Sequence, residues 1–288
     1  MNKLIRSLKN IFSILIFVAI IPSLLLTIKT QYSAFFIPTT KIGQIILEGS
    51  IDQAEPMIES LRIFFKDTSI KAILLRCESP GGYPGSSQAL FREIQHLKKE
   101  YPKPIITLTE NICASGAYYV ACATDYIIAT PAALVGSIGT RFSTFFNAKK
   151  WLESHNITSD TISAGSYKTA LSPFTDLTQV QKNMLIEIAQ DTYEQFAHDV
   201  SVSRKLPYTQ KDTWANGRIF TGQQALALKL IDATGSYTDA LQMLHKLAPI
   251  TGEITWVKAG EKSSFQQWIE TVKKIFSLQV QSWIPVRY

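Results

Sequence analysis

An uninterrupted apolar segment near the N-terminus constrains this chain more than any other sequence feature. Residues 11–28 read IFSILIFVAIIPSLLLTI, eighteen residues without a charge. As a helix with a rise of about 1.5 Å per residue, this run is about 27 Å long, enough to cross the hydrocarbon core of a bilayer. We therefore expect a cytoplasmic stub and a membrane anchor over residues 1–40, with the folded part of the chain beginning near residue 41.

Basic residues around the apolar run predict its orientation. They are Lys3, Arg6 and Lys9 before it and Lys29 after it. Because Lys and Arg favour the cytoplasmic side, the N-terminus is expected in the cytoplasm and the rest of the chain outside it. A cleaved signal peptide would share the basic start, but cleavage after Ala34 would put Tyr32 where a small residue is preferred. We favour an uncleaved single-pass anchor in a bacterial inner membrane.

The net charge of +6 arises mainly from the N-terminal segment. Residues 1–41 hold five basic and no acidic residues, whereas the remainder has 24 basic against 23 acidic residues. A nucleic-acid surface needs clustered positive charge on the folded domain, so nucleic acid is not an expected partner.

Cysteine and histidine give no sign of a metal site. Cys77, Cys113 and Cys122 lack ligand spacing and are expected to be small buried residues. The four histidines are scattered through polar, helix-like segments and are expected at the surface. We expect no cofactor.

Strand-like and helix-like segments alternate through the first half of the folded part. Strands are expected at 42–47, 70–77, 104–109, 126–130 and 135–139, and helices at 52–66, 86–100 and 114–123. The nearly continuous apolar run IKAILLRC at 70–77 is typical of a buried parallel strand. Residues 78–82 are expected to form a turn. The alternation predicts α/β architecture with parallel pairing.

Beyond Leu177 the pattern becomes helical. Thr178 and Gln181 form a possible capping box before a helix that continues through Val200, and Thr221 is placed to cap a short helix in GQQALALKL. Apolar residues at helical spacing over 265–276 predict an amphipathic helix. It would lie on a membrane, on a neighbouring subunit or on its own domain.

Two segments have the residue types of a serine hydrolase site. Gly81 and Gly82 follow a buried strand, where their N–H groups could form half of an oxyanion hole, although a plain tight turn explains them equally. Ser115 and Gly116 begin a helix, where free N–H groups would favour an alkoxide and an oxyanion. Close packing of small residues is the alternative.

A nucleophilic serine needs a base, and no histidine lies in a recognisable triad motif. The search therefore turns to Lys168, which lies among small residues in a loop-like segment. An ordinary lysine amine has a pKa of about 10.4 and acts as a base near neutral pH only where burial lowers it.

Five segments, taken together and in this order, resemble the signal peptide peptidase A (protease IV) family of serine–lysine membrane proteases. That family belongs to the fold group of Clp protease and crotonase. The likeness extends from about residue 42 to residue 232. It comprises ESPGG at 78–82, ASGAYYVACATD at 114–125, TPAALVGSIGT at 130–140, SYKTALSPF at 166–174 and GRIFTGQQALALKLID at 217–232.

The resemblance implies roles for particular residues. Ser115 matches the nucleophile, Lys168 the general base, and Ser137 the hydroxyl that holds the lysine amine. Gly82 and Gly116 match the oxyanion donors. Glu78 departs from the family pattern, in which a smaller polar residue is usual.

The resemblance also implies a fold, an assembly and a substrate. It implies a ClpP/crotonase-like β-α-β spiral, with a peptidase domain at 41–250 and a C-terminal extension at 251–288. The chain would form a homo-oligomeric ring in which adjoining subunits share catalytic groups. Residual signal peptides and other membrane-derived peptides would be its substrates, with an apolar pocket preferring small or aliphatic residues.

Two other functions remain open from the sequence. A crotonase-like enzyme acting on acyl-CoA would use paired amides to hold an enolate, but it would need a base such as a glutamate. A catalytically inactive, membrane-anchored scaffold would form rings without turnover.

Overall fold

The computed structural model describes residues 38–142 and 146–258, together with Ile21. The predicted anchor at 11–28, apart from Ile21, and the predicted amphipathic helix at 265–276 lie outside these residues. Within the described ranges, no helix has both the length and the apolar character needed to cross a membrane.

Two long parallel strands form the centre of the sheet. β1 (Thr39–Ile51) and β2 (Ile70–Gly82) pair from one end to the other. β2 pairs with β3 through its first half and with β4 at Ser79, so the sheet divides into two branches there. The other strands are β3 (Ile105–Thr109), β5 (Tyr126–Ala129) and β8 (Ala233–Thr234) in one branch, β4 (Ile112–Ala114), β6 (Leu134–Gly136) and β7 (Ile219–Thr221) in the other, and β9 (Glu253–Lys258) beside β1.

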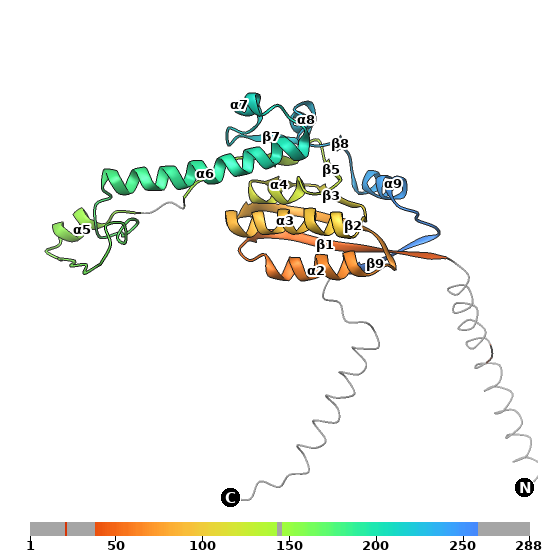
Figure 1. Ribbon diagram of the computed structural model, residues 1–288, viewed down its shortest axis with the longest axis horizontal. Helices are drawn as coiled ribbons and strands as arrows, with labels where there is room; N and C mark the ends of the chain where they lie inside the picture. Colours follow the sequence, from red (N-terminus) through yellow and green to blue (C-terminus); the bar gives the residue numbers. More distant parts are fainter. Residues whose placement is uncertain (1–20, 22–37, 143–145, 259–288) are drawn as a thin grey trace, which may run out of the picture.

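Parallel pairing is confirmed throughout the described sheet except between β6 and β7, which are antiparallel. The curled, mainly parallel α/β arrangement is consistent with the expected spiral fold (Figure 1). β9 follows directly on the predicted domain boundary at residue 250, so the sheet includes the first part of the predicted extension.

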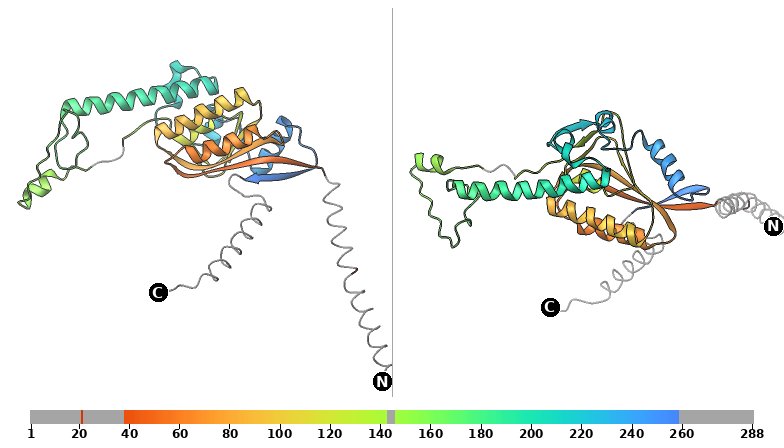
Figure 2. Two further views of the ribbon diagram at one scale, coloured as in Figure 1. Left: turned by 60° about the horizontal axis from the view of Figure 1, so that its bottom comes forward. Right: turned by 45° about the horizontal axis from the view of Figure 1, so that its top comes forward.

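Helices cover both faces of the branch that contains β3. Ile73 and Leu75 belong to the apolar cluster that includes residues of α2 (Glu55–Lys66), α3 (Pro84–Glu100) and α4 (Gly116–Ala121). Leu74, whose side chain alternates to the other face, belongs to the cluster around Leu244 of α9 (Tyr237–Leu247). Figure 2 shows α2 and α3 on one side of these strands and α9 on the other.

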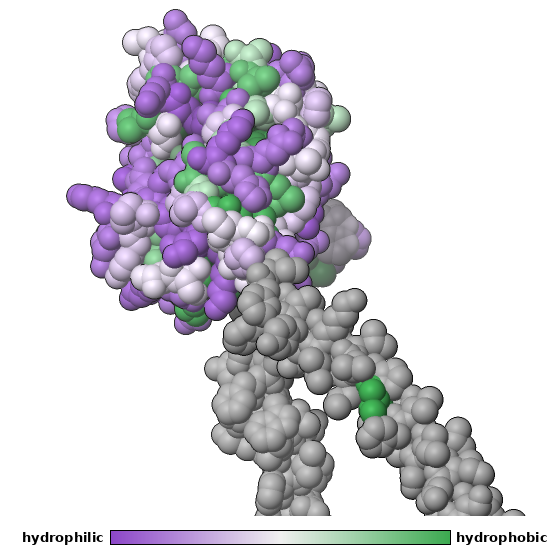
Figure 3. All heavy atoms as spheres, turned by 90° about the vertical axis from the view of Figure 1, so that its right-hand side faces the viewer, coloured by the Kyte–Doolittle hydropathy of each residue, from purple (hydrophilic) through white to green (hydrophobic). Residues whose placement is uncertain are grey.

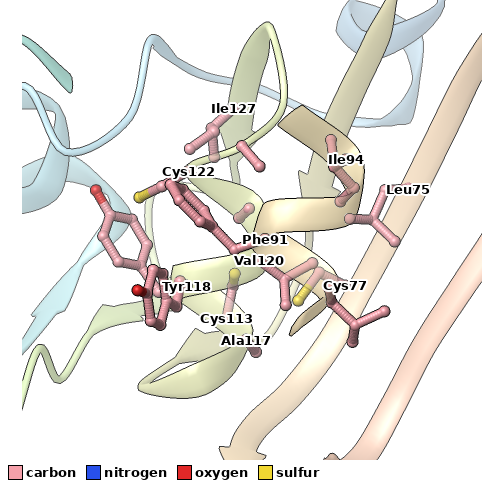
Figure 4. Packing of buried hydrophobic residues seen from close by; sticks show 14 of the residues in the cluster. Leu75, Cys77, Phe91, Ile94, Cys113, Ala117, Tyr118, Val120, Cys122 and Ile127 are labelled. Carbon is pink, nitrogen blue, oxygen red and sulfur yellow. The ribbon is translucent and has the colours of Figure 1, made fainter. Parts of the chain in front are cut away.

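The core beneath the start of α4 contains all three cysteines. Cys77, Cys113 and Cys122 are buried and unpaired, as predicted, and pack with Tyr118 and neighbouring apolar residues (Figure 4). Burial raises the pKa of Cys122 to about 12 and also raises that of Tyr118. The four histidines are exposed, as predicted.

Three of the predicted boundaries that are wrong lie close to the site described below. Residues 78–82 are strand because β1 has an irregularity between Glu48 and Ser50 that lets the pairing continue to Gly82. The helix predicted at 114–123 begins only at Gly116, since Ala114 pairs in β4. The strand predicted at 135–139 ends at Gly136, because Ser137 adopts a positive φ.

α6 (Gln179–Arg204) is about 39 Å long at 1.5 Å per residue. The predicted capping box of Thr178 and Gln181 is present at its start, and Thr221 caps α8 (Gly222–Ala227) in the same way. Shorter helical segments connect α6 to β7, namely η1 (Tyr208–Gln210) and α7 (Lys211–Trp214). The C-terminal part of α6 packs over α4, while its N-terminal part projects beyond the sheet (Figure 1).

Residues 146–178, which we call the arm, lie at the projecting end of α6 and include α5 (Lys149–Ser154) (Figures 1 and 2). The arm exposes several large apolar side chains. They are Phe146, Trp151, Ile157, Ile162, Tyr167, Leu171 and Phe174. By contrast, the surface seen from the α9 side is mainly hydrophilic, with apolar residues confined to small patches (Figure 3). The arm therefore presents an apolar surface that the other described residues do not cover.

Candidate functional site

Two serines follow neighbouring strand ends. Ala114 of β4 pairs with Gly136 of β6, so Ser115 and Ser137 are the next residues along two parallel strands. The Ser115 N–H donates to the Gly136 carbonyl at 2.7 Å, and the Ser137 N–H donates to the Arg218 carbonyl at 2.8 Å. Both serines are partly exposed. The register of β4 and β6 thus brings together two hydroxyls that are 22 positions apart in the sequence.

Ser115 has an unusual backbone conformation, with φ 53° and ψ −127°. A residue other than glycine held at positive φ costs on the order of 1–3 kcal/mol, which the surrounding structure must offset. Here the hydrogen bond from Ser115 to β6 and the immediate start of α4 fix the turn. The sharp change from strand to helix leaves the side chain at the surface of a cleft.

The glycines after Ser79 pack directly on this turn. A Cβ on Gly81 would lie 2.7 Å from the Gly116 nitrogen and 2.8 Å from the Ser115 Cβ. A Cβ on Gly116 would lie 3.3 Å from the Gly82 nitrogen and would overlap Ser87. The structure therefore places the Gly82 and Gly116 amides side by side next to Ser115, with no room for larger residues at these positions.

Two hollows meet at Ser115. The larger, which we call the cleft, has a volume of about 660 Å³ and is lined by Ser115, Ser137 and Gly82, with Asp52 and Arg141 also in its walls. The smaller, which we call the side chamber, has a volume of about 220 Å³. Its walls come from α3, α4 and α6, from Gly82 and Ser115, and from the segment after β6. The residues from the helices are Pro84, Gly85, Ser87, Gln88, Gly116, Tyr119, Thr192, Gln195 and Phe196, and those after β6 are Gly139 and Thr140.

Tyr119 joins the side chamber to a buried carboxylate that the sequence analysis missed. Its hydroxyl donates to Asp199 at 2.5 Å and accepts from Gln88 at 3.2 Å, while Arg92 donates to Asp199 at 3.0 Å. Burial, followed by the bond to Asp199, raises the pKa of the Tyr119 hydroxyl. The available signal was an acidic residue three positions after Phe196, on the apolar face of a helix.

Glu78 binds the loop before β4 through its carboxylate. Its carboxylate accepts backbone N–H bonds from Glu110 at 2.7 Å, Asn111 at 3.1 Å and Ile112 at 3.3 Å. The residue that departs from the family pattern therefore anchors the segment that leads to Ser115.

Lys168 lies in the arm, away from the cleft in the same chain. It is exposed, and its segment is held at the start of α6, where Gln181 donates to the Ser166 carbonyl at 3.0 Å. Thr192, which lines the side chamber, is eleven residues further along that helix, about 16 Å away at 1.5 Å per residue. The structure thus gathers Ser115, Ser137, Gly82 and Gly116, but Lys168 lies in the arm and does not line the cleft of the same chain.

The described residues contain no cluster of His, Cys, Asp and Glu side chains suited to a metal ion. At the cleft, the Ser115 hydroxyl lies on a strained turn beside the Gly82 and Gly116 amides, where two parallel strands of the α/β sheet end. Fold and cleft together define a hydrolase of the serine class.

Comparison with known proteins identifies the family. Residues 97–251 match peptidase family S49. The chain is 37% identical over 188 residues to a protein of Methanocaldococcus jannaschii named as a protease, covering 65% of this chain and 59% of that protein. It is 32% identical over 225 residues to the chloroplastic serine protease SPPA of Arabidopsis thaliana, covering 77% of this chain and 33% of that one.

A third relative carries the family name. An Enterococcus faecium protein named as signal peptide peptidase SppA is 31% identical over 194 residues, covering 67% of this chain and 56% of that protein. The chain therefore spans between a third and three fifths of the length of these three relatives. It belongs to peptidase family S49, the signal peptide peptidase A family of serine proteases.

Proposed function

We propose that this protein hydrolyses peptide bonds with Ser115 as nucleophile and Lys168 as general base. The observation that carries the proposal is the turn at Ser115, which directs a hydroxyl into the cleft beside the Gly82 and Gly116 amides. Preorganised N–H donors beside a nucleophile are what acyl transfer requires, because they stabilise the charge of the tetrahedral intermediate.

In the proposed mechanism, the neutral Lys168 amine takes the proton of Ser115, and the serine oxygen attacks the scissile carbonyl. The Gly82 and Gly116 amides hold the oxyanion, and the lysine then gives the proton to the leaving amine. Water activated by the same lysine releases the acyl group. Ser137, whose strand end adjoins that of Ser115, would hold the amine in place by a hydrogen bond.

The base would come from a neighbouring copy in a homo-oligomeric ring. Lys168 lies on the arm at the N-terminal end of α6, where apolar side chains are exposed, while the side chamber beside Ser115 is lined by the middle of the same helix. Packing of the arm on an adjacent copy would bury these side chains and desolvate the amine in the same step.

Residual signal peptides and other membrane-derived peptides are the proposed substrates. We propose that the apolar run at 11–28 anchors residues 1–40 in a bacterial inner membrane, with the peptidase domain at 41–250 outside the cytoplasm. Such an anchor would place the peptidase domain where signal peptides remain after cleavage. Tethering would raise the local concentration of such peptides at the membrane surface. Residues 251–288 would form the C-terminal extension.

The first test replaces the two proposed catalytic residues. We expect Ser115→Ala and Lys168→Ala each to lower kcat/KM for an unstructured peptide by at least about a hundredfold, because each loses its role in proton or acyl transfer. Ser60→Ala, at a partly exposed site on α2, and Lys182→Ala, at an exposed site on α6, are the matched controls and should keep wild-type rates. Full activity of Ser115→Ala would refute the proposed peptidase function.

Mixing the two inactive variants tests whether the base comes from a neighbour. Co-assembly of equal amounts of Ser115→Ala and Lys168→Ala should restore about a quarter of the wild-type rate, because one neighbouring pair in four combines an intact serine with an intact lysine. If well-mixed oligomers stay inactive, the two residues do not meet across an interface.

A further inference from the structure

Lysines gather at the edge of the sheet where its parallel strands begin. β1, β2 and β3 run in the same direction, so their first residues share this edge, which we call the entry edge. Lys41 pairs with Ile70, Lys71 is the next residue of β2, and Lys103 precedes β3 by two residues. Lys66 ends α2, which leads into β2. Three neighbouring strands and one helix thus each contribute a lysine to the same edge.

Hydrogen bonds at the end of α2 hold these lysines close together. Lys103 Nζ donates to three carbonyls of this segment, including that of Asp67 at 2.7 Å, and Lys71 Nζ donates to the next carbonyl along the chain at 2.9 Å. Hydrogen bonds with Ser69, helped by the charges of Lys41 and Lys103, lower the pKa of the Asp67 carboxyl. Carbonyl partners do not neutralise an ammonium group, so these bonds leave its positive charge in place.

The entry edge has more positive than negative charge. Around the starts of β1, β2, β3, β5 and β9, including the last turns of the helices that precede them, seven lysines lie against four acidic residues. The lysines are Lys41, Lys66, Lys71, Lys98, Lys99, Lys103 and Lys246, and the acidic residues are Asp67, Glu100, Asp125 and Glu253. By contrast, residues 38–258 as a whole hold 21 basic and 21 acidic residues. The excess is therefore a local property of this edge.

Helix ends explain only part of the cluster. A lysine in the last turn of a helix stabilises the negative end of the helix dipole, which accounts for Lys66 and Lys99. Lys41 and Lys71 lie on strands instead, and both are exposed. Neither forms an ion pair with another described residue. Their ammonium groups are therefore accessible to an anion from outside the fold.

The proposed anchor leads into the fold at this same edge. β1 begins at Thr39, and ten residues separate it from Ile28, the last residue of the apolar run. Ten residues reach at most about 36 Å when fully extended, so the entry edge must lie near the membrane surface. Figure 3 views the molecule from the side on which β1 begins, and the described surface there is mainly hydrophilic.

We propose that the entry edge binds the phosphate groups of anionic phospholipids, with Lys41, Lys66 and Lys71 as the contacts. Lysines beside an anionic lipid surface are attracted to it within a Debye length, and several neighbouring lysines add their effects. These contacts hold the domain in one orientation above the membrane instead of letting it tumble on its tether. This inference rests on the anchor proposed for residues 1–40 and is independent of the peptidase chemistry.

The test measures how fast each lysine of the full-length protein reacts with an amine reagent that does not cross membranes, with mass spectrometry as the readout. The protein is reconstituted in vesicles of phosphatidylcholine alone or with about a third phosphatidylglycerol. Lys41, Lys66 and Lys71 should react at least about threefold more slowly in the anionic vesicles, because lipid phosphates cover their ammonium groups. About 1 M salt should abolish the difference, since it shortens the Debye length to about 3 Å. Lys182, exposed at the start of α6, is the internal control and should react equally in both.

A double variant tests whether the lysines act as one surface. Lys41→Gln combined with Lys71→Gln should remove the protection of Lys66 in anionic vesicles. Lys150→Gln combined with Lys182→Gln, at exposed sites on α5 and α6, is the matched control and should leave that protection intact. Unchanged thermal unfolding in detergent shows that both variants fold. Persistent protection of Lys66 in the first variant would contradict a shared surface.

An alkaline carbonate wash of the vesicles separates this inference from the proposed anchor. If the protein stays in the vesicles and its lysines react equally with both lipids, the headgroup contact is wrong and the anchor stands. If the wash removes the protein, the anchor fails, and the inference fails with it. If inorganic phosphate protects Lys41 and Lys71 equally well in phosphatidylcholine vesicles at the same ionic strength, the edge binds free anions and the lipid assignment is overturned.

Discussion

At the scale of single residues, the shape of the cleft depends on glycines whose backbone packs directly against the backbone of a neighbouring segment. Gly81, Gly82 and Gly116 each occupy a position where a Cβ would overlap a neighbouring segment. For Gly82 the neighbour is Ile51 of β1, and for Gly81 it is the turn at Ser115. These glycines therefore define the distance between the loop and the proposed nucleophile.

Gly81 gives the sharpest residue-level prediction. Gly81→Ala adds a Cβ that would lie 2.7 Å from the Gly116 nitrogen, at a φ of +98° that side chains disfavour. We expect the free energy of unfolding to fall by about 1–3 kcal/mol and peptidase activity to fall because the Gly116 amide shifts. Urea unfolding and peptide turnover provide the measurements.

Gly85→Ala is the natural control for that change. A Cβ on Gly85 meets nothing within 4 Å, and the residue lies in the first turn of α3. Its stability should stay the same or rise slightly, since alanine favours a helix. A loss of stability in Gly85→Ala equal to that in Gly81→Ala would mean that close approach is not the cause.

Sequence patterns predicted the residue types of the cleft, but not its geometry. ESPGG and the segment around Ser115 pointed to two halves of a site because both follow strand-like runs. Asp199 and Gln88 gave no comparable signal. Their contact with Tyr119 depends on how α3 and α6 cross α4, which local spacing cannot specify.

At the scale of elements, α4 is a short helix with ionisable groups buried in the core. It carries Tyr118 and Tyr119, and Cys122 follows as its C-cap. Burial is the largest cause of a raised pKa for all three, and that of Cys122 reaches about 12. Each group therefore keeps its proton in the folded state at pH values where the unfolded chain loses it.

Alkaline pH should therefore destabilise the folded state, because these groups of α4 and its C-cap lose their protons more readily in the unfolded chain. A pKa raised by folding contributes full stability below the unfolded value and loses it as pH rises toward the folded value. We expect the free energy of unfolding to fall from about pH 9 upward, by up to about 1.4 kcal/mol per pH unit for each buried group. Urea titrations between about pH 8 and about pH 11 measure this fall.

Cys122→Ala separates the thiol from the tyrosines. The variant should be less stable at every pH because it leaves a small cavity, yet its stability should decline less steeply above about pH 9. An alkaline slope identical to that of the wild type would show that Cys122 does not contribute.

Element types were more predictable than element ends. The apolar run at 70–77 indicated a buried parallel strand, and Thr178 with Gln181 fixed the start of α6. The extension of β2 to Gly82 depends on an irregularity in β1, which is a tertiary feature. The short β4 before α4 likewise exists only because β2 and β6 lie on either side of it.

At the scale of the whole molecule, the arm exposes a group of large apolar side chains that the other described residues do not cover. Ile162 is fully exposed, with a relative accessibility of 102%. Replacing Ile162 should not destabilise the described part of the fold, so we use its effect to report on contacts with another molecule.

Ile162→Asp tests whether the arm mediates assembly. We expect unchanged thermal stability of the single chain, a shift toward monomers in sedimentation velocity, and loss of peptidase activity, because an aspartate at an apolar interface is desolvated without a partner. Ile63→Asp, at an exposed site on α2, should leave both assembly and activity intact. Wild-type assembly of Ile162→Asp would place the interface elsewhere.

The length of α6 has a consequence for the timing of proteolysis. The middle of this helix borders the side chamber beside the proposed nucleophile, and its N-terminal end holds the segment with the proposed base. A freshly synthesised, solitary copy would thus be latent, and cutting would start only when enough copies had accumulated to meet. Turnover per molecule would then increase with enzyme concentration. Nascent membrane proteins would thereby be protected from cleavage by single copies.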